Sequence, residues 1–236
     1  MQIAAREGFA AANKRGGHTA ADYATDGLVA LWDGIENAGY GVHNPTATAW
    51  KNLVGAVGGD FVVTAGHFTD NALAVTGVNY TRTAGMPSSP TNTLTVDVAF
   101  TIPNVVRTAG AMFSWRFETS GPLVTSTAWS YFRITGGSNG TYGNDTNSYD
   151  LVPFVGKSFN ATMTTFVGQN GLYVGGALAR SAFTTRASFN AKYKALLNAG
   201  GQGEIRYHSV RVYSRFLSAS EIAANAAIDK ERFNLP

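Results

Sequence analysis

The chain has 236 residues, of which 44% are hydrophobic and only 14% are charged, and it contains 27 glycines and no cysteine. Its length and apolar content suffice for one large domain with a sizeable core, while the absence of cysteine excludes disulfides and thiolate metal sites. The formal net charge of +3 is too small for this length to indicate a nucleic-acid partner.

Residues 1–25 are rich in alanine and lack a continuous apolar face, so they predict an N-terminal arm or a short helix. We expect such an arm to bind protein partners in a larger assembly or to mediate self-association; an unstructured terminus is the alternative. The first residues lack the basic and apolar stretches of a signal peptide, and no apolar run reaches the ~20 residues of a membrane helix. The sequence therefore predicts a protein made without a signal peptide and without a membrane span.

From residue 26 to residue 236 the sequence predicts a β-sandwich. Apolar and polar residues alternate at 94–100, which places Leu94, Val96, Val98 and Phe100 on one face of a strand. The segment 112–118 alternates in the same way. Regularly spaced strands separated by turn residues are typical of an all-β sandwich or barrel.

A hairpin is predicted around Asn170-Gly171, because this pair lies between two segments of high β-propensity and favours a tight turn. One helix is predicted near the C-terminus. Ser218 and Glu221 form a capping box, in which the Ser218 hydroxyl accepts a hydrogen bond from the Glu221 amide and the Glu221 carboxylate accepts one from the Ser218 amide. Residues 222–228 favour a helix strongly, and this helix closes the sandwich.

Two end segments and one hairpin share a distinctive pattern. The opening segment begins D-G-L-V-A-L-W-D-G at residue 26, the closing one reads V-R-V-Y-S-R-F-L-S-A-S-E-I over 210–222, and the hairpin reads G-Q-N-G-L-Y-V-G-G over 168–176. They resemble laminin-G-like domains of the concanavalin A-like lectin/glucanase superfamily. The resemblance implies a jelly-roll sandwich of two antiparallel sheets, in which the first and last strands pair and a short C-terminal helix follows.

The same superfamily contains glycoside hydrolases, whose retaining β-glucanases carry paired carboxylates in a pattern like Glu-x-Asp-x-x-Glu. That pattern is missing here, and the six glutamates are isolated. Asp97 and Glu118 take the polar phase of their strands, which predicts solvated carboxylates. A nucleophile elbow, a phosphate-binding loop and a His-x-x-x-His pair are also missing. The sequence therefore predicts that the chain is not an enzyme and has no catalytic residue.

The segment 136–150 concentrates polar side chains and tyrosines. Tyrosine rings can stack on a sugar while amides and carboxylates bind its hydroxyls. An ordinary long hairpin loop is the alternative interpretation, because all these residues also favour turns. The predicted ligand-binding residues are Tyr142, Asn144, Asp145, Asn147 and Tyr149.

Asp145 and Asp150 in this loop are candidate Ca²⁺ ligands, since calcium prefers oxygen ligands. No EF-hand pattern surrounds them, and no other cofactor is expected.

The sequence leaves three functions open. The first is a non-catalytic structural, decoration or appendage component of a virion, such as that of a bacteriophage, or of a bacterial surface assembly, with glycan recognition as an added role. The alternative is a stand-alone carbohydrate-binding, lectin-like module, and a glycoside hydrolase is the least favoured. The missing signal peptide, the missing cysteines and the low charge favour a virion or surface-associated assembly.

Overall fold

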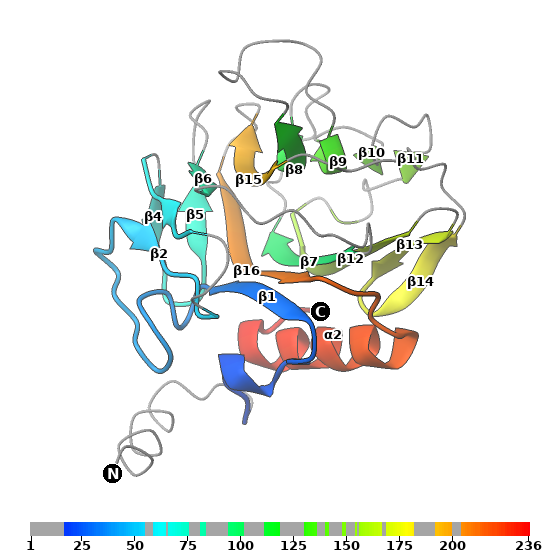
Figure 1. Ribbon diagram of the computed structural model, residues 1–236. Coiled ribbons are helices and arrows are strands. Elements are labelled where there is room, and N and C mark those ends of the chain that lie inside the picture. The colour runs from blue at the N-terminus through cyan, green and yellow to red at the C-terminus, as the bar shows by residue number, and fades with distance from the viewer. Residues whose placement is uncertain are drawn as a thin grey trace.

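Two antiparallel β-sheets form a sandwich, and one helix lies under the outer face of the larger sheet (Figure 1). The predicted all-β fold with a short C-terminal helix is confirmed. This computed structural model describes residues 17–54, 59–64, 66–75, 81–83, 94–101, 111–118, 130–135, 140–141, 148–149, 154, 156–166, 169–181, 192–199 and 204–236.

The larger sheet has eight strands. In spatial order they are β14 (Ala177–Ser181), β13 (Gln169–Val174), β12 (Ser158–Phe166), β7 (Leu94–Thr101), β16 (Ile205–Tyr213), β5 (Leu73–Val75) and β4 (Gly66–Phe68), with β1 (Leu28–Asp33) also paired to β16. The smaller sheet has six strands, in the order β2 (Ala49–Trp50), β3 (Phe61–Val62), β6 (Thr81–Thr83), β15 (Lys192–Ala199), β8 (Ala111–Glu118) and β9 (Ser130–Thr135). Strands β10 (Gly140–Thr141) and β11 (Ser148–Tyr149) form a separate pair.

The first and last strands of the sandwich pair, as the resemblance to laminin-G-like domains implies. Strands β1 and β16 are antiparallel, with Trp32 opposite Val210. Because these strands come from opposite ends of the chain, their pairing joins the opening and closing segments into the middle of the larger sheet.

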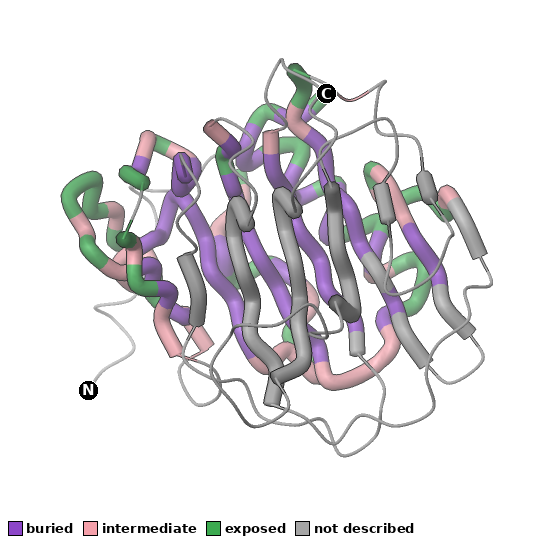
Figure 2. Tube along the Cα trace, turned by 90° about the horizontal axis from the view of Figure 1, so that it is seen from above, coloured by how far each residue is buried: buried purple, intermediate pink, exposed green. Residues whose placement is uncertain are grey.

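The hydrophobic core fills the space between the sheets. Val96, Val98 and Phe100 of β7 are buried there, on the face that their alternation predicts. The rings of Trp32 and Phe61, one from each sheet, meet edge to face with centroids 4.8 Å apart. Figure 2 shows the buried stretches of neighbouring strands side by side along the sheet.

Helix α2 (Ala219–Phe233) begins with the predicted capping box. The Glu221 amide donates to the Ser218 hydroxyl over 3.3 Å, and the Ser218 amide donates to the Glu221 carboxylate over 2.8 Å. The helix ends at Asn234, whose left-handed backbone lets its amide donate to the Lys230 carbonyl. Seven buried side chains at helical spacing line the face toward the sheet: Ile222, Asn225, Ala226, Ile228, Asp229, Arg232 and Phe233.

The hairpin between β12 and β13 exists, but Asn170-Gly171 is not its turn. The strands pair from Phe166 opposite Gln169 outward, so Asn170 and Gly171 lie within β13. A Cβ at residue 171 would lie 2.8 Å from the Tyr173 ring, so glycine lets that ring pack close to the strand.

Residues 17–25 contain a short 3-10 helix, η1 (Ala20–Asp22). Ala20 and Tyr23 are buried and cluster with Leu31 of β1 and Ile228 of α2. The division of the chain at residue 25, and the role of residues 1–25 in binding partners, stay predictions.

No helix in the described ranges combines the length and apolar character that crossing a membrane requires.

Candidate functional site

A polar layer separates the larger sheet from α2. Side chains that alternate with core residues on β7, β12 and β16 point to the outer face of the sheet, and the helix covers that face (Figure 1). Asp97 is therefore fully buried, and the prediction that it is solvated is wrong. Its polar phase was predicted correctly; the covering helix is what excludes water. The side chain of Glu118 lies outside the described part.

Arg211 of β16 is the centre of this layer. Its Nη2 lies 2.8 Å from Asp97 Oδ2, and its Nη1 lies 2.6 Å from Asp229 Oδ1 of α2. All three side chains have no exposed surface. One guanidinium thus joins two strands of the sheet to the helix through charge-assisted hydrogen bonds.

Neutral partners complete the hydrogen bonding of the two carboxylates. The Asn160 amide donates to Asp97 over 2.6 Å and to Asp229 over 2.7 Å. The Thr162 hydroxyl donates to Asp97 over 2.9 Å, and the Tyr23 hydroxyl to Asp229 over 2.8 Å. The layer is therefore satisfied internally, as a buried ionic cluster must be.

For each of these ionisable groups, burial and the neighbouring charges shift the pKa in opposite directions. Burial raises the pKa of Asp97, although Arg211 opposes the shift. Burial disfavours the charged form of Arg211, but Asp229 and Asp97 outweigh it and raise the pKa of the guanidinium well above its ordinary value. Arg211 therefore keeps its charge.

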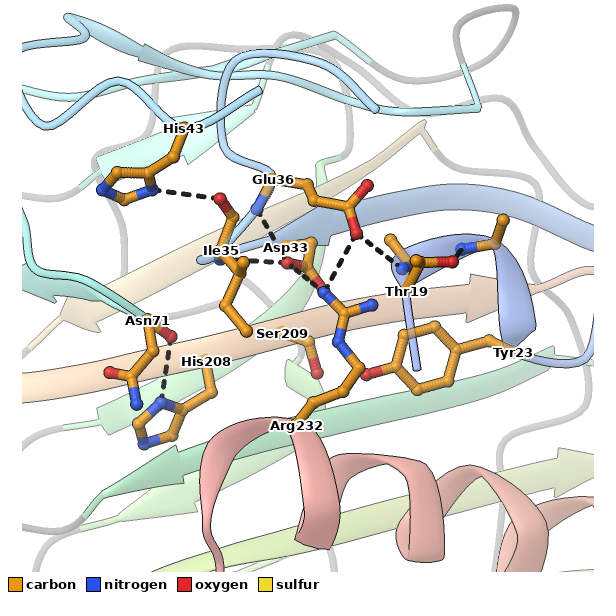
Figure 3. A network of polar contacts seen from close by, with 12 residues as sticks. Thr19, Tyr23, Asp33, Ile35, Glu36, His43, Asn71, His208, Ser209 and Arg232 are labelled. Carbon is orange, nitrogen blue, oxygen red and sulfur yellow. Dashed lines mark hydrogen bonds and ion pairs between the residues drawn. The ribbon is translucent and has the colours of Figure 1, made fainter. Parts of the chain in front are cut away.

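A second buried cluster lies where α2 meets the end of β1 (Figure 3). Arg232 Nη2 lies 2.9 Å from Asp33 Oδ1 and 3.2 Å from Glu36 Oε1. The second Glu36 oxygen accepts from the amide of Gly41 over 2.9 Å. Burial raises the pKa of Asp33 to about 6, although Arg232 opposes the shift.

Both clusters fasten the helix to the sheet. Asp97, Arg211, Asp229 and Arg232 are at most 1% exposed, so a ligand cannot contact them while α2 is in place. The ligand-accessible chemistry of the described chain must therefore lie elsewhere.

An open pocket of about 610 Å³ lies beside this polar layer, between the edge of the larger sheet and the C-terminal end of α2. Its volume is within the range of about 300–1,000 Å³ that is usual for small-molecule sites. The described lining residues are Phe154, Lys157, Ser158, Phe159, Asn160, Val174, Gly175, Ala177, Leu178, Ala179, Ala226, Lys230, Leu235 and Pro236. We call it the basic pocket, because the only ionisable side chains among these described lining residues are those of Lys157 and Lys230.

The tight turn between β13 and β14 shapes one wall of the basic pocket. Gly175 and Gly176 both have positive φ, of 58° and 83°, as a two-residue turn between twisted strands requires. Gly176 also lies so close to α2 that a Cβ would meet Ala226 at 3.0 Å. The turn therefore rests directly on the helix.

The two lysines of the basic pocket differ from the other described cations. Neither ammonium group has an ion pair or hydrogen bond within the described part of the chain, and both lysines are exposed. Each of the other lysine and arginine side chains that the structure describes pairs with a carboxylate: Lys51, Arg206, Arg211, Arg215 and Arg232. Among the lysine and arginine side chains that the structure describes, the unpaired positive charge is thus gathered in this pocket.

A chain of hydrogen bonds connects the basic pocket to a buried histidine. Ser158 Oγ lies 2.6 Å from Thr101 Oγ1, which lies 2.9 Å from His208 Nε2. On the other side of the ring, His208 Nδ1 lies 3.1 Å from the carbonyl oxygen of Asn71 (Figure 3). Burial lowers the pKa of His208 to about 4, so the ring is neutral near pH 7.

The binding residues predicted from the sequence lie almost entirely outside the described ranges. This applies to Tyr142, Asn144, Asp145, Asn147 and Asp150. Tyr149 is in β11, opposite Gly140. The glycan-binding and Ca²⁺ roles of this loop stay predictions. Among the residues that the structure does describe, no three His, Asp or Glu side chains come together as a metal site.

Sequence reasoning missed the basic pocket. Lys157 and Lys230 are far apart in the chain and belong to no motif, and only the fold of the hairpin against α2 brings them to one cavity. The buried layer left a weak signal, because Asn225, Asp229 and Arg232 follow helical spacing within the apolar stripe of α2.

Comparison with known proteins finds no matching family model and no matching curated sequence. Solved structures do match. Trypanosoma rangeli sialidase in complex with sialic acid aligns with 88% of this chain and 33% of its own, at a TM-score of 0.62 and 17% identity. A mutant of this sialidase that displays trans-sialidase activity aligns with 97% of this chain and 37% of its own, at a TM-score of 0.62 and 15% identity.

The receptor-binding domain of botulinum neurotoxin C/D mosaic serotype aligns with 85% of this chain and 51% of its own, at a TM-score of 0.57 and 13% identity. At these identities the likeness shows the fold alone. The chain spans about a third of the sialidases and about half of the toxin domain.

This comparison contradicts two predictions made from the sequence: that the chain is a non-catalytic structural or appendage component, and that it is not an enzyme. The second prediction rested on missing catalytic motifs, above all that of the retaining β-glucanases. The structures that share the fold include sialidases, which are glycoside hydrolases that use other catalytic residues. A missing β-glucanase motif therefore does not exclude an enzyme. The matching proteins also give no support to a virion or bacteriophage origin.

Proposed function

We propose that this domain binds carbohydrate in the basic pocket, as part of a protein that processes glycans. The observation that carries the proposal is the gathering of both unpaired described cations, Lys157 and Lys230, in one open cavity. The remaining lining is apolar or weakly polar, with Phe154 and Leu178 among it. An apolar wall with a few convergent polar groups is the usual composition of a small-ligand site.

The structural likeness supports the same proposal. A sialidase in complex with sialic acid shares the fold over 88% of this chain. Because the chain spans only a third of that sialidase, we propose that it acts as one domain of a larger protein or beside a partner. The closing segment 210–222 supports a finer proposal, that the sandwich belongs to the laminin-G-like group.

Blocking the basic pocket tests this function. Ala177 lines the pocket and is exposed on β14, so Ala177→Trp places an indole in the cavity at little cost to the core. Val62 is 58% exposed on β3 of the other sheet, and Val62→Trp is the matched control. Titration of the purified chain with sialic acid and with neutral mono- and disaccharides is followed by saturation-transfer NMR. We expect at least one sugar to bind to the wild type and the control, and not to Ala177→Trp; equal binding by all three proteins would place the site elsewhere.

A further inference from the structure

The hydrogen-bond chain behind Ser158 has a fixed direction. The Asn71 carbonyl oxygen can only accept, so His208 Nδ1 carries the proton of the neutral ring. Nε2 is then an acceptor, and the Thr101 hydroxyl must donate to it. With its single proton used, Thr101 accepts from Ser158. The proton of Ser158 therefore points away from the pocket.

This direction decides what Ser158 offers a ligand. Its Oγ presents lone pairs to the basic pocket and no proton, so it accepts a hydrogen bond from a ligand hydroxyl. A sulfate oxygen, which carries no proton near pH 7, would instead face those lone pairs. Ser158 thus favours a ligand hydroxyl over a bare anion oxygen.

The side chain of Asn160, which also lines the pocket, already donates its hydrogen bonds to other residues. The Asn160 amide donates both of its protons, one to Asp97 and one to Asp229, so it has no proton left for a ligand. Among the described side chains of the pocket, the free donors are therefore the ammonium groups of Lys157 and Lys230, and none of these side chains is a carboxylate. A neutral sugar would leave both charges without a partner.

We propose that the basic pocket takes a sugar acid: Lys157 and Lys230 bind its carboxylate, and Ser158 accepts a hydrogen bond from one of its hydroxyls. This rests on the proposed function and gives its ligand class. The apolar C–H face of such a ring packs against Phe154 and Leu178, which line the same cavity. Sialic acid has a carboxylate, several hydroxyls and an apolar ring face, and serves as the probe.

Sialic acid and its carboxyl methyl ester differ only at the carboxyl group, which is charged in the acid and neutral in the ester. Comparing their affinities therefore measures what the carboxylate contributes to binding. Isothermal titration compares both with the wild type, with Lys157→Gln/Lys230→Gln, with Ser158→Ala and with the control Lys51→Gln, whose lysine pairs with Asp60 away from the pocket. Both pocket lysines are exposed, so their replacement leaves the core intact. Thermal melting of each variant checks that it is folded.

We expect the acid to bind at least tenfold more tightly than the ester, because charge-assisted hydrogen bonds are lost in the ester. The double lysine variant should lose this preference, whereas Lys51→Gln keeps it. Ser158→Ala should weaken the acid and the ester by the same factor, about three- to tenfold, since one neutral hydrogen bond is removed.

Equal binding of acid and ester to the wild type, with both abolished by Ala177→Trp, would overturn the sugar-acid assignment and leave the proposed function standing. Binding of neither compound, nor of any neutral sugar, would overturn both. A titration with inorganic sulfate tests the role of Ser158 separately. Sulfate that competes with sialic acid and binds as tightly as sialic acid, or more tightly, would contradict that role.

Discussion

Arg211 on the last strand forms an ion pair with Asp229 of helix α2, and neither side chain has any exposed surface. The helix is therefore held to the sheet by buried charge as well as by apolar contact. Lys230 follows Asp229 directly, and Asn160, which donates to Asp229, lines the basic pocket. The contacts that fix the helix thus also fix one wall of the proposed site, and the stability of this layer can be tested apart from binding.

Arg211→Met should destabilise the protein strongly. The substitution leaves the carboxylates of Asp97 and Asp229 buried without their cation, which costs about 3–5 kcal/mol of unfolding free energy. Arg206→Met is the matched control, because Arg206 is on the same strand but exposed and pairs with Glu204 at the surface. Urea denaturation should show a change below about 1 kcal/mol for the control. Equal losses in the two variants would show that the buried pair contributes no more than a surface pair.

His208→Gln should make the free energy of unfolding depend less on pH between about 4 and 6.5. Burial lowers the pKa of His208 from 6.5 to about 4, so between these values the unfolded chain binds a proton that the folded chain does not. The wild type therefore loses stability as the pH falls from about 6.5 to 4, by about 3 kcal/mol from this group. Denaturant titrations at several pH values measure it. A wild-type-minus-variant difference that is constant with pH would refute the shift.

Asp33→Asn should show that Asp33 makes stability depend on pH in the opposite direction from His208. Burial raises the pKa of Asp33 from 3.8 to about 6, so in this window the folded chain holds a proton that the unfolded chain has lost. The stabilisation that protonated Asp33 contributes is complete below about pH 3.8. It is lost as the pH rises through 6, and the free energy of unfolding falls by about 3 kcal/mol over this range. Relative to Asp33→Asn, the wild type should thus weaken as the pH rises. His208 acts in the opposite direction over nearly the same window, and burial also raises the pKa of Asp97. The wild-type curve alone therefore cannot isolate either group, and denaturant titrations of both variants are needed; a wild-type-minus-Asp33→Asn difference that does not change with pH would contradict the shift of Asp33.

Gly176→Ala should cost more stability than Gly175→Ala. Both glycines have positive φ, so each alanine carries a backbone cost of about 1–2 kcal/mol. At Gly176 the new Cβ would also meet Ala226 at 3.0 Å and the Ala223 backbone at 3.1 Å, whereas at Gly175 nothing lies within 4 Å. Thermal melting should rank the variants in that order, and equal melting temperatures would contradict the close contact between turn and helix.

The sequence predicted much of the sandwich because strand alternation, the capping box and the closing segment are local patterns. Val96, Val98 and Phe100 face the core as their spacing requires, and Ser218 and Glu221 cap α2. The environment of the outer face could not be predicted, because the same alternation fits a solvated carboxylate and one covered by a helix.

The turn of the β12–β13 hairpin was misplaced for a related reason. Asn170-Gly171 favours a tight turn, but both residues lie within β13, where Gly171 leaves room for the Tyr173 ring. The basic pocket depends on residues distant in the chain, Lys157 and Lys230, which only the tertiary fold brings together. No local pattern marks such a site.

The most direct test of the central claim is a map of where sialic acid binds. Backbone amide chemical shifts are recorded by two-dimensional NMR on the isotope-labelled chain as sialic acid is added. We predict saturable shifts at Lys157, Ser158, Gly175, Ala177 and Lys230, around the basic pocket. Shifts confined to other residues, such as the predicted loop residues Tyr142 and Tyr149, would contradict the assignment of the pocket as the ligand site.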